Sequence, residues 1–442
     1  MKKTLLSIMA AAGLIASGAA LADSSVVEIY GFLNADFENV KAAAATSPVA
    51  APGQIGVATA TTAATGQAQP SRNRVTTNSS NIGFRGKEDL GMGWKALFQI
   101  ESQLNLDGGD STKTQTSATP VGTLASRNSA VGLLHDKYGT IFYGIWDLPT
   151  KVIHNSIDAF YATGIGSGNA MYGSPGFGVV TTTQTARAGA GTPAAPNAAD
   201  ASFDRRQGNS VQYWSPNIYG FTAKLAYSAN EQRSVQTPLA PAFGINPTIY
   251  ALGLVYERGP FRIGYTFEQH RVYFGLSALG GNAPSAGNNT ARDNENSVVV
   301  SYKLETGLGI TTIGALYERL SYNNSDTAAA GLLHYHRDAV YVSLLHKIGN
   351  GTIRASFGDA RQGSCERVNL AACSTRGLDA RQYVLGYSYS LSKRTDLYAL
   401  WTVVNNGAFA AYQLGNNNNA FSATIPVGAR QQAYGLGIRH VF

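Results

Sequence analysis

The chain has 442 residues and a formal net charge of +7, without the Lys/Arg clusters typical of nucleic-acid-binding proteins. Beyond the N-terminus no apolar stretch reaches the roughly 20 residues that a transmembrane helix needs, so a membrane protein with this sequence must be a β-barrel. The abundance of Gly, Tyr, Asn, Ser and Thr indicates an all-β fold with many turns.

The N-terminus has the pattern of a secretory signal peptide. Two lysines precede an apolar run over residues 5–15, and an A-x-A cleavage site ends at Ala22. The apolar run is too short for a membrane-spanning helix, which is the alternative. We therefore predict a signal peptide at residues 1–22 and a mature chain, residues 23–442, that forms a single barrel domain.

From Val27 onward, apolar and polar side chains alternate with the period of two that is typical of strands. The alternation is clean in many runs, such as residues 259–268, and weak in others, such as residues 337–347. The pattern predicts sixteen strands, at residues 27–38, 79–87, 93–104, 127–135, 138–146, 208–215, 219–229, 247–258, 259–268, 294–304, 308–318, 337–347, 350–360, 380–391, 393–404 and 430–442.

Short and long connections alternate between these strands. Seven are tight turns, and the other eight are long, at residues 39–78, 105–126, 147–207, 230–246, 269–293, 319–336, 361–379 and 405–429. A soluble β-sandwich also alternates, but sixteen strands are too many for one packed core. We therefore predict a 16-stranded antiparallel transmembrane β-barrel with short periplasmic turns, long extracellular loops and an aqueous lumen.

The third long connection, residues 147–207, has about 60 residues, and a loop of that length is usually functional or disordered. Its part at residues 150–162 is compatible with a short helix, and Gly/Ala/Pro-rich segments follow. If this loop folds inward it narrows the pore, whereas an exposed loop would have no such role.

Several segments resemble the general-diffusion porins of β-proteobacteria, the Gram-negative trimeric porin family that includes the neisserial type. They are SSNIGFRGKEDLGMGWKALFQIES at residues 79–102, RNSAVGL at 127–133, YGTIFYGIWDLPTKV at 138–152, RQGNSVQYWSPNIYGFTAKLAYSANE at 206–231, and the closing GLGIRHVF. The resemblance implies a homotrimer of 16-stranded barrels, each with its third long loop folded inward as a constriction.

The resemblance also implies two constriction arginines, Arg127 and Arg206, which match arginines that face acidic groups of the loop in anion-favouring members. Two other family positions depart from the pattern. Asn81 stands where an arginine is frequent, and Trp146 replaces a polar residue. These departures argue against strong anion selectivity.

Parity along the strands independently places a set of charged side chains opposite the apolar face, where they should line water. Such charges set the field in the lumen, although each alone is more commonly just a solvated group. The predicted pore-lining or constriction residues are Arg127, Arg206, Arg85, Lys87, Lys95, Arg262, Arg354, Glu101, Asp147 and Asp158.

The two cysteines, Cys365 and Cys373, stand eight residues apart in a polar stretch, and the exported context favours a disulfide that staples a loop over two free thiols. No catalytic motif such as G-x-S-x-G or H-E-x-x-H is present, so we predict no enzyme and no cofactor. His334 and His336 are a weak metal candidate, and a solvated loop is the simpler interpretation.

The chain ends in a strand on Phe442, as expected if the last strand pairs with the first and closes the barrel. By resemblance, the terminal aromatic is a signal for the outer-membrane assembly machinery, and outer-membrane lipid and lipopolysaccharide are further partners. We predict an outer-membrane porin for small hydrophilic solutes and ions, with weak anion preference. The alternatives are a substrate-specific channel and a surface adhesin or structural barrel.

Overall fold

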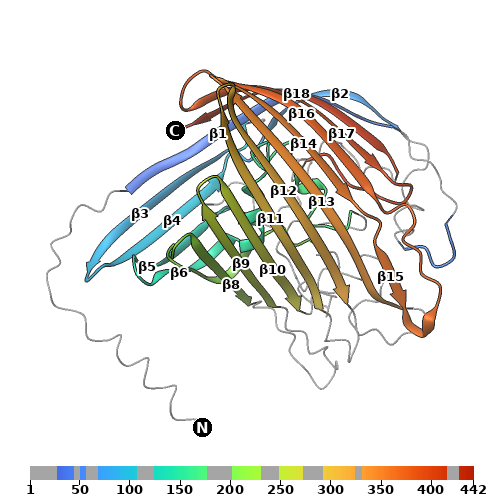
Figure 1. Ribbon diagram of the computed structural model, residues 1–442, viewed down its shortest axis with the longest axis horizontal. Helices are drawn as coiled ribbons and strands as arrows, with labels where there is room; N and C mark the ends of the chain where they lie inside the picture. Colours follow the sequence, from blue (N-terminus) through green and yellow to red (C-terminus); the bar gives the residue numbers. More distant parts are fainter. Residues whose placement is uncertain are drawn as a thin grey trace, which may run out of the picture.

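A computed structural model describes residues 27–43, 50–55, 68–106, 124–176, 202–229, 248–271, 292–323, 331–415 and 428–442. The described strands form one sheet that closes on itself as an antiparallel barrel (Figure 1). The predicted signal peptide lies outside the described residues. Within them, no helix is both long and apolar enough to cross a membrane.

Eighteen strand segments make up the sheet. They are β1 (Val27–Ala42), β2 (Gln69–Thr77), β3 (Asn81–Gly91), β4 (Trp94–Gln103), β5 (Ser129–His135), β6 (Gly139–Asp147), β7 (Arg206–Trp214), β8 (Phe221–Ala229), β9 (Thr248–Arg258), β10 (Phe261–Arg271), β11 (Arg292–Thr306), β12 (Gly309–Asn323), β13 (Leu332–Ile348), β14 (Gly351–Ala360), β15 (Ser364–Arg367), β16 (Ala380–Ser390), β17 (Thr395–Asn406) and β18 (Arg430–Val441).

The eighteen segments correspond to sixteen barrel strands, which confirms the predicted strand number. Segment β2 continues the line of β3, because both pair with β1, and β15 continues the line of β14 along β13 in the same way. The prediction of plain loop at residues 39–78 and 361–379 was therefore wrong in part. β2 (QPSRNRVTT) and the four-residue β15 (SCER) have no clear apolar alternation to reveal them.

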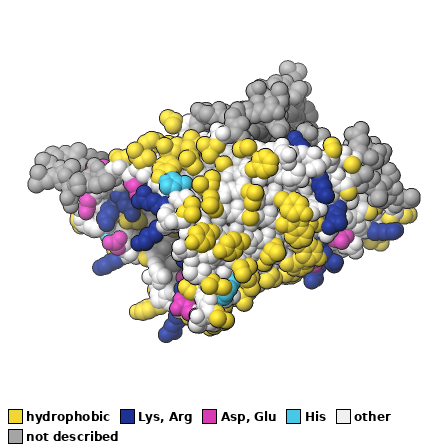
Figure 2. Space-filling model, turned by 90° about the horizontal axis from the view of Figure 1, so that it is seen from above, with side chains coloured by type: hydrophobic (Ala, Val, Ile, Leu, Met, Phe, Trp, Pro, Cys, Tyr) yellow, Lys and Arg dark blue, Asp and Glu magenta, His cyan; other side chains and the backbone are white. Residues whose placement is uncertain are grey.

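Alternation decides which side of each strand faces outward. On β10, Ile263 and Tyr265 are exposed on the outer face, whereas Thr266 and Glu268 are buried on the inner face. Figure 2 shows hydrophobic side chains across the middle of the visible face and charged side chains toward its edges. This arrangement is expected for a barrel surrounded by hydrocarbon.

The chain closes the barrel with its last residues. β1 and β18 pair in a continuous register from Phe32 and Val441 to Ala42 and Gln431. The backbone N–H of Phe442 donates to the carbonyl oxygen of Gly31 at 3.1 Å, so pairing extends to the terminal residue. Closure leaves no unpaired strand edge along this seam.

Candidate functional site

The third long loop enters the barrel instead of extending from its rim (Figure 1). It follows β6 and begins with the short helix α2 (Pro149–Asn155), which has a proline in its first turn. A 3-10 turn, η2 (Gly168–Ala170), comes later, and the described part of the loop reaches Gly176. The helix covers only the first half of residues 150–162, which the sequence marks as compatible with a short helix.

Glycines on the inner face of the barrel make room for this loop. A Cβ atom added to any of them would lie between 2.5 and 3.3 Å from a loop side chain, which is tighter than ordinary packing. The pairs are Gly253 and Gly264 against Ile153, Gly314 against Ile157, Gly386 against Phe160, Gly435 against Ile165, and Gly358 against Met171. We call these six glycines the glycine track. It lets the loop pack directly against the wall from β9 to β18.

Hydrogen bonds from the wall hold the loop backbone. The hydroxyl of Ser343 donates to the carbonyl oxygen of Ile157 at 2.6 Å, and the amide of Gln382 donates to that of Ser167 at 3.1 Å. The Arg354 guanidinium donates to the carbonyl oxygen of Ala159 at 2.6 Å. Because these donors come from three different strands, the loop is held along its length.

Asp158 folds the loop itself. Its carboxylate accepts from the backbone N–H groups of Phe160, Ala162 and Gly168 at 2.7 to 2.9 Å. Burial nevertheless raises the pKa of Asp158, because those hydrogen bonds do not fully offset the loss of hydration. The carboxylate is thus engaged within the loop, and its predicted role in lining the pore stays a prediction.

A buried ionic cluster anchors the helix of the loop. Nδ1 of His154 lies 3.3 Å from an Asp204 carboxylate oxygen, and its Nε2 lies 3.6 Å from Glu295 and 2.7 Å from the Ser297 hydroxyl. Burial alone would lower the pKa of His154, but the neighbouring carboxylates of Asp204 and Glu295 outweigh burial and raise the pKa to about 10. A charged imidazolium therefore connects the loop to the wall at neutral pH.

The same cluster contains the group most able to hold a metal ion among the described residues. Ligand atoms of His154, Glu295 and Glu318 lie within 4.8 Å of one another. Glu318 also accepts from the backbone N–H of Gly173 at 2.7 Å and lies 3.4 Å from the Arg337 guanidinium. Since both ring nitrogens of His154 already face carboxylates, the ion pairs account for this geometry.

The two arginines assigned by resemblance lie where the loop leaves the wall. Nε of Arg127 is 2.5 Å from Glu101, a carboxylate that also accepts from the Tyr30 hydroxyl at 3.1 Å. Nε of Arg206 is 3.2 Å from Asp147. All four charged side chains are 10 to 16% exposed, so they reach water without projecting freely into it.

A third cation and an amide complete this group. Lys151, in the first turn of α2, lies 3.4 Å from Asp147, which therefore faces two cations. The Asn128 side chain donates to Asp147 at 3.0 Å and accepts from Nε of Arg206 at 2.7 Å. The sequence-based set thus contains two carboxylates and two arginines of one network but misses Lys151 and Asn128. The position of Lys151, four residues after Asp147 at a helix start, could have indicated it.

The other predicted lumen residues lie apart from this network. Arg85 pairs with Glu28 at 2.8 Å, about half exposed, and register places Lys87 and Lys95 on the inner face near the short turns. Arg262 reaches both the Ser156 hydroxyl and, at 3.7 Å, Glu257. The predicted positive lining is therefore distributed along the lumen and not collected at one level.

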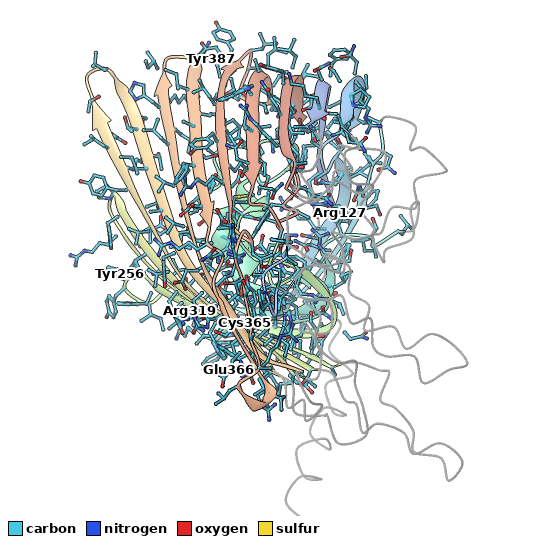
Figure 3. The ribbon with its side chains drawn as sticks, turned by 90° about the vertical axis from the view of Figure 1, so that its right-hand side faces the viewer. Arg127, Tyr256, Arg319, Cys365, Glu366 and Tyr387 are labelled. Atoms are coloured by element: carbon cyan, nitrogen blue, oxygen red, sulfur yellow. A yellow bond between two sulfur atoms is a disulfide. The ribbon has the colours of Figure 1, made fainter. Side chains whose placement is uncertain are left out.

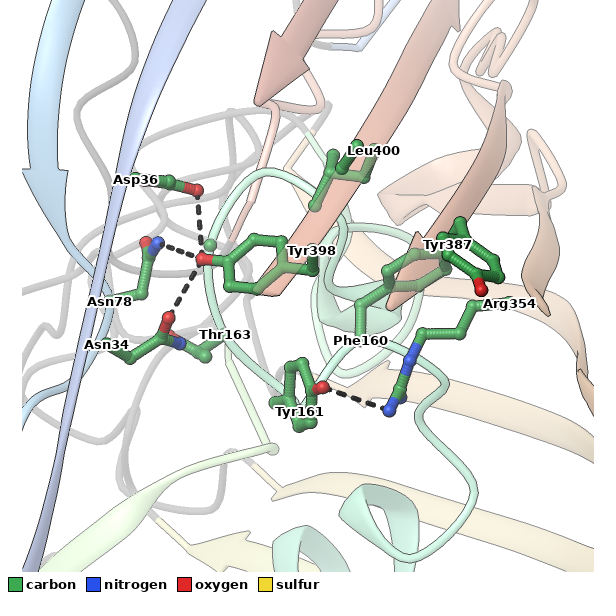
Figure 4. A pocket seen from close by; sticks show the side chains of 12 residues that line it. Asn34, Asp36, Asn78, Phe160, Tyr161, Thr163, Arg354, Tyr387, Tyr398 and Leu400 are labelled. Atoms are coloured by element: carbon green, nitrogen blue, oxygen red, sulfur yellow. Dashed lines mark hydrogen bonds between the residues drawn. The ribbon is translucent and has the colours of Figure 1, made fainter. Parts of the chain in front are cut away.

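A second cationic group lies where the loop passes β14 and β18. The guanidinium carbons of Arg354 and Arg439 are 4.3 and 5.0 Å from the ring centroid of Tyr161, and the Arg354 guanidinium donates to the Tyr161 hydroxyl at 3.0 Å (Figure 4). On the other side, the Tyr398 hydroxyl donates to Asn34 at 2.8 Å and to Asp36 at 3.2 Å. The tyrosines separate the cations from the buried carboxylates of β1.

A disulfide joins Cys365 and Cys373, whose Cα atoms are 5.9 Å apart, at the end of the barrel that carries the long loops (Figure 3). Both cysteines pack against an apolar cluster that includes Tyr335 and Phe409. Arg127 lies well away from this end in Figure 3, so the disulfide belongs to the mouth and not to the arginine network.

The sequence profile of the Gram-negative porin family matches residues 7–409. Outer membrane porin protein 32 of Delftia acidovorans is 28% identical over the full length of both chains. The major outer membrane protein P.IB of Neisseria meningitidis is 24% identical over 82% of this chain and 83% of its own. The anion-selective porin from Comamonas acidovorans has a similar fold, with a TM-score of 0.63, 22% identity, and coverage of 95% of this chain and 100% of its own.

Proposed function

The chain belongs to the Gram-negative porin family, and we propose that its constriction is the passage between the docked third loop and the wall that carries Arg127 and Arg206. The protein is an outer-membrane porin, a water-filled channel for the passive diffusion of small hydrophilic solutes and ions. Its family and relatives are channel proteins.

A weak preference for anions is the finer part of the proposal. The observation that carries it is the balance of charge in one network, where three cations, Arg127, Arg206 and Lys151, form ion pairs with two carboxylates, Glu101 and Asp147. Low-dielectric walls focus this excess into the lumen and raise the local concentration of anions. The Comamonas porin of similar fold is described as anion-selective, which agrees with the proposal.

A salt-gradient reversal potential in a planar bilayer tests the proposal. We expect a modest potential of the sign given by faster anion passage, decreasing at high ionic strength as the lumen charges are screened. A clear cation preference at low salt would contradict it.

Assembly and export complete the proposal. We propose a homotrimer with an exported precursor whose signal peptide is residues 1–22 and whose mature chain, residues 23–442, is one barrel domain. Phe442, held in the closing strand, would serve the assembly machinery, and the outer surface would contact lipid and lipopolysaccharide. Chemical cross-linking and detergent electrophoresis without heating should give a trimer.

A substrate-specific channel remains the second candidate, because aromatic side chains gather on one part of the lumen wall. Rings of Phe142, Trp146 and Trp214 contact one another on the inner face of β6 and β7. Saturation of the conductance by one solute at low concentration would favour this candidate over general diffusion.

A further inference from the structure

We propose that the lumen wall formed by β6, β7 and β8 carries a binding subsite for planar organic anions, built by Trp146, Trp214 and Lys224. The ligand class is an aromatic ring with a carboxylate. The inference deepens the proposed channel function and rests on it, because a solute reaches this wall only through the lumen.

The three aromatic rings form one continuous cluster. The centroids of Phe142 and Trp146 are 5.0 Å apart, those of Phe142 and Trp214 are 5.4 Å apart, and those of the two tryptophans are 6.2 Å apart. The two indoles are nearly perpendicular, at 83°. Phe142 is buried at the base, whereas both tryptophans are partly exposed. Apart from the face of Trp214 that Lys224 covers, the exposed indole surfaces are therefore available to a third ring in an edge-to-face or offset contact.

Strand pairing places this cluster inside the barrel. Gln212 pairs with Phe142, and Trp214 pairs with Lys224, so these side chains share one face of the sheet. Lys224 in turn pairs with Gly253, whose missing Cβ position is filled by Ile153 of the docked loop. The loop lies in the lumen, so the face that carries the aromatic cluster is the lumen face.

The cation of the subsite is Lys224. Its ammonium nitrogen lies 3.1 Å from the centroid of the Trp214 ring. Within the described part of the chain, no carboxylate forms an ion pair with Lys224, and Arg262 is the charged group that acts on it electrostatically. Two neighbouring cations lie beside an aromatic surface, and Glu257 forms an ion pair with Arg262 at 3.7 Å, so Lys224 leaves positive charge for an anion to neutralise.

The wall beside the cluster presents small side chains. Ala130 and Gly144 pair with each other, and Gly132 pairs with Phe142, which is the large side chain at the base of the cluster. In the proposed complex the ring of the ligand contacts the indoles and its carboxylate reaches toward Lys224. An aliphatic acid of equal charge lacks the ring contact, and an aromatic cation is repelled by Lys224 and Arg262.

Channel block tests the subsite, with sodium benzoate as the probe and sodium acetate at equal ionic strength as its charge control. We expect benzoate to reduce the single-channel current saturably and acetate not to do so. Trp214→Leu and Lys224→Gln should each raise the half-blocking benzoate concentration by about tenfold, since each removes one of two contacts. Benzylammonium should not block the wild type.

Matched controls are Trp401→Leu, which removes an outward-facing indole on β17, and Lys393→Gln, which removes an exposed lysine in the turn before β17. Both should keep the wild-type block. Quenching of indole fluorescence by benzoate in detergent, reduced in Trp214→Leu and unchanged in Trp401→Leu, measures binding even in a variant that inserts poorly.

Equal effects of benzoate and acetate on the wild type, or unchanged block in both subsite variants, would overturn the inference while leaving a conducting general porin. A folded, inserted wild type that conducts no ions would overturn the proposed channel function, and the subsite with it. The two failures are therefore distinguishable in one experiment.

Discussion

The inner surface of the barrel differs in its side chains between two walls, one from β9 to β18 and the other from β3 to β8. The first carries the glycine track and buried acids, and the loop packs on it with its apolar residues, such as Ile153 and Met171, fully buried. The second carries bulky or charged groups that reach water, among them Trp146, Trp214 and Arg85. The alternation of apolar and polar side chains is the same on both walls.

This contrast shows how one sheet pattern provides both an anchor and a channel surface. Where the loop must pack, the inner side chains are removed or made hydrogen-bond donors, as Gly314 and its strand partner Ser343 illustrate. On the wall along which we propose that solutes pass, large or charged side chains such as Trp214 and Arg85 remain. The two surfaces differ by their position around the barrel and not by the pattern of their strands. Substitutions on one wall should therefore affect the channel differently from the same type of substitution on the other wall.

The largest effect should follow from filling the glycine track. In Gly314→Phe the new Cβ would lie 2.8 Å from Cβ of Ile157, so the loop cannot keep its place. Overpacking of this kind costs on the order of 1–3 kcal/mol. We expect the loop to leave the wall and the single-channel conductance to change severalfold, with greater variation between channels. In Gly307→Phe, where an added Cβ meets nothing within 4 Å, the conductance should stay at the wild-type value. Equal conductance in both variants would show that the track does not position the loop.

The next effect concerns the sign of the lumen charge. Converting Arg127 and Arg206 together to Ala leaves Glu101 without its arginine and Asp147 with Lys151 alone. The reversal potential should move toward cations because the local field becomes less positive. The Arg127→Lys, Arg206→Lys double variant keeps the charge and should keep the sign. No shift in the alanine variant would place both arginines outside the constriction.

The sequence predicted the barrel well because closure and alternation are repeated many times. The final strand ending at Phe442 indicated closure with β1. The loop packing was not predictable in this way. Ile153 and Gly253 are separated by a hundred residues, and nothing in the local pattern of either one indicates their contact. Likewise, Trp214 and Lys224 lie on neighbouring strands, and the alternation within each strand does not show that they meet.

A smaller effect should appear when His154 loses its proton. The pKa of His154 in the folded loop is above the usual 6.5. The stabilisation that the charged imidazolium gives to the docked loop is therefore fully present below about pH 6.5, and it is lost as the pH rises through about 10. Each pH unit in that window removes up to about 1.4 kcal/mol of docking free energy. The charged groups facing it are Asp204, Glu295 and Glu318. Channel noise should increase between pH 7 and 10 in the wild type. His154→Gln, which cannot titrate, should give a nearly flat profile, and identical profiles would exclude His154 as the titrating group.

The smallest effect on conduction should come from the disulfide, because it lies at the mouth and not on either lumen wall. Chain-entropy arguments give a loop closed over eight residues about 2.5 kcal/mol of stabilisation. That stabilisation is local to β15 and the apolar cluster that holds Cys365 and Cys373. Reduction, or the double change to Ser, should therefore make this segment more sensitive to added protease. The conductance and the reversal potential should remain within error of the wild type. A change in selectivity on reduction would contradict this expectation. It would mean that the disulfide at the mouth affects the position of the docked loop.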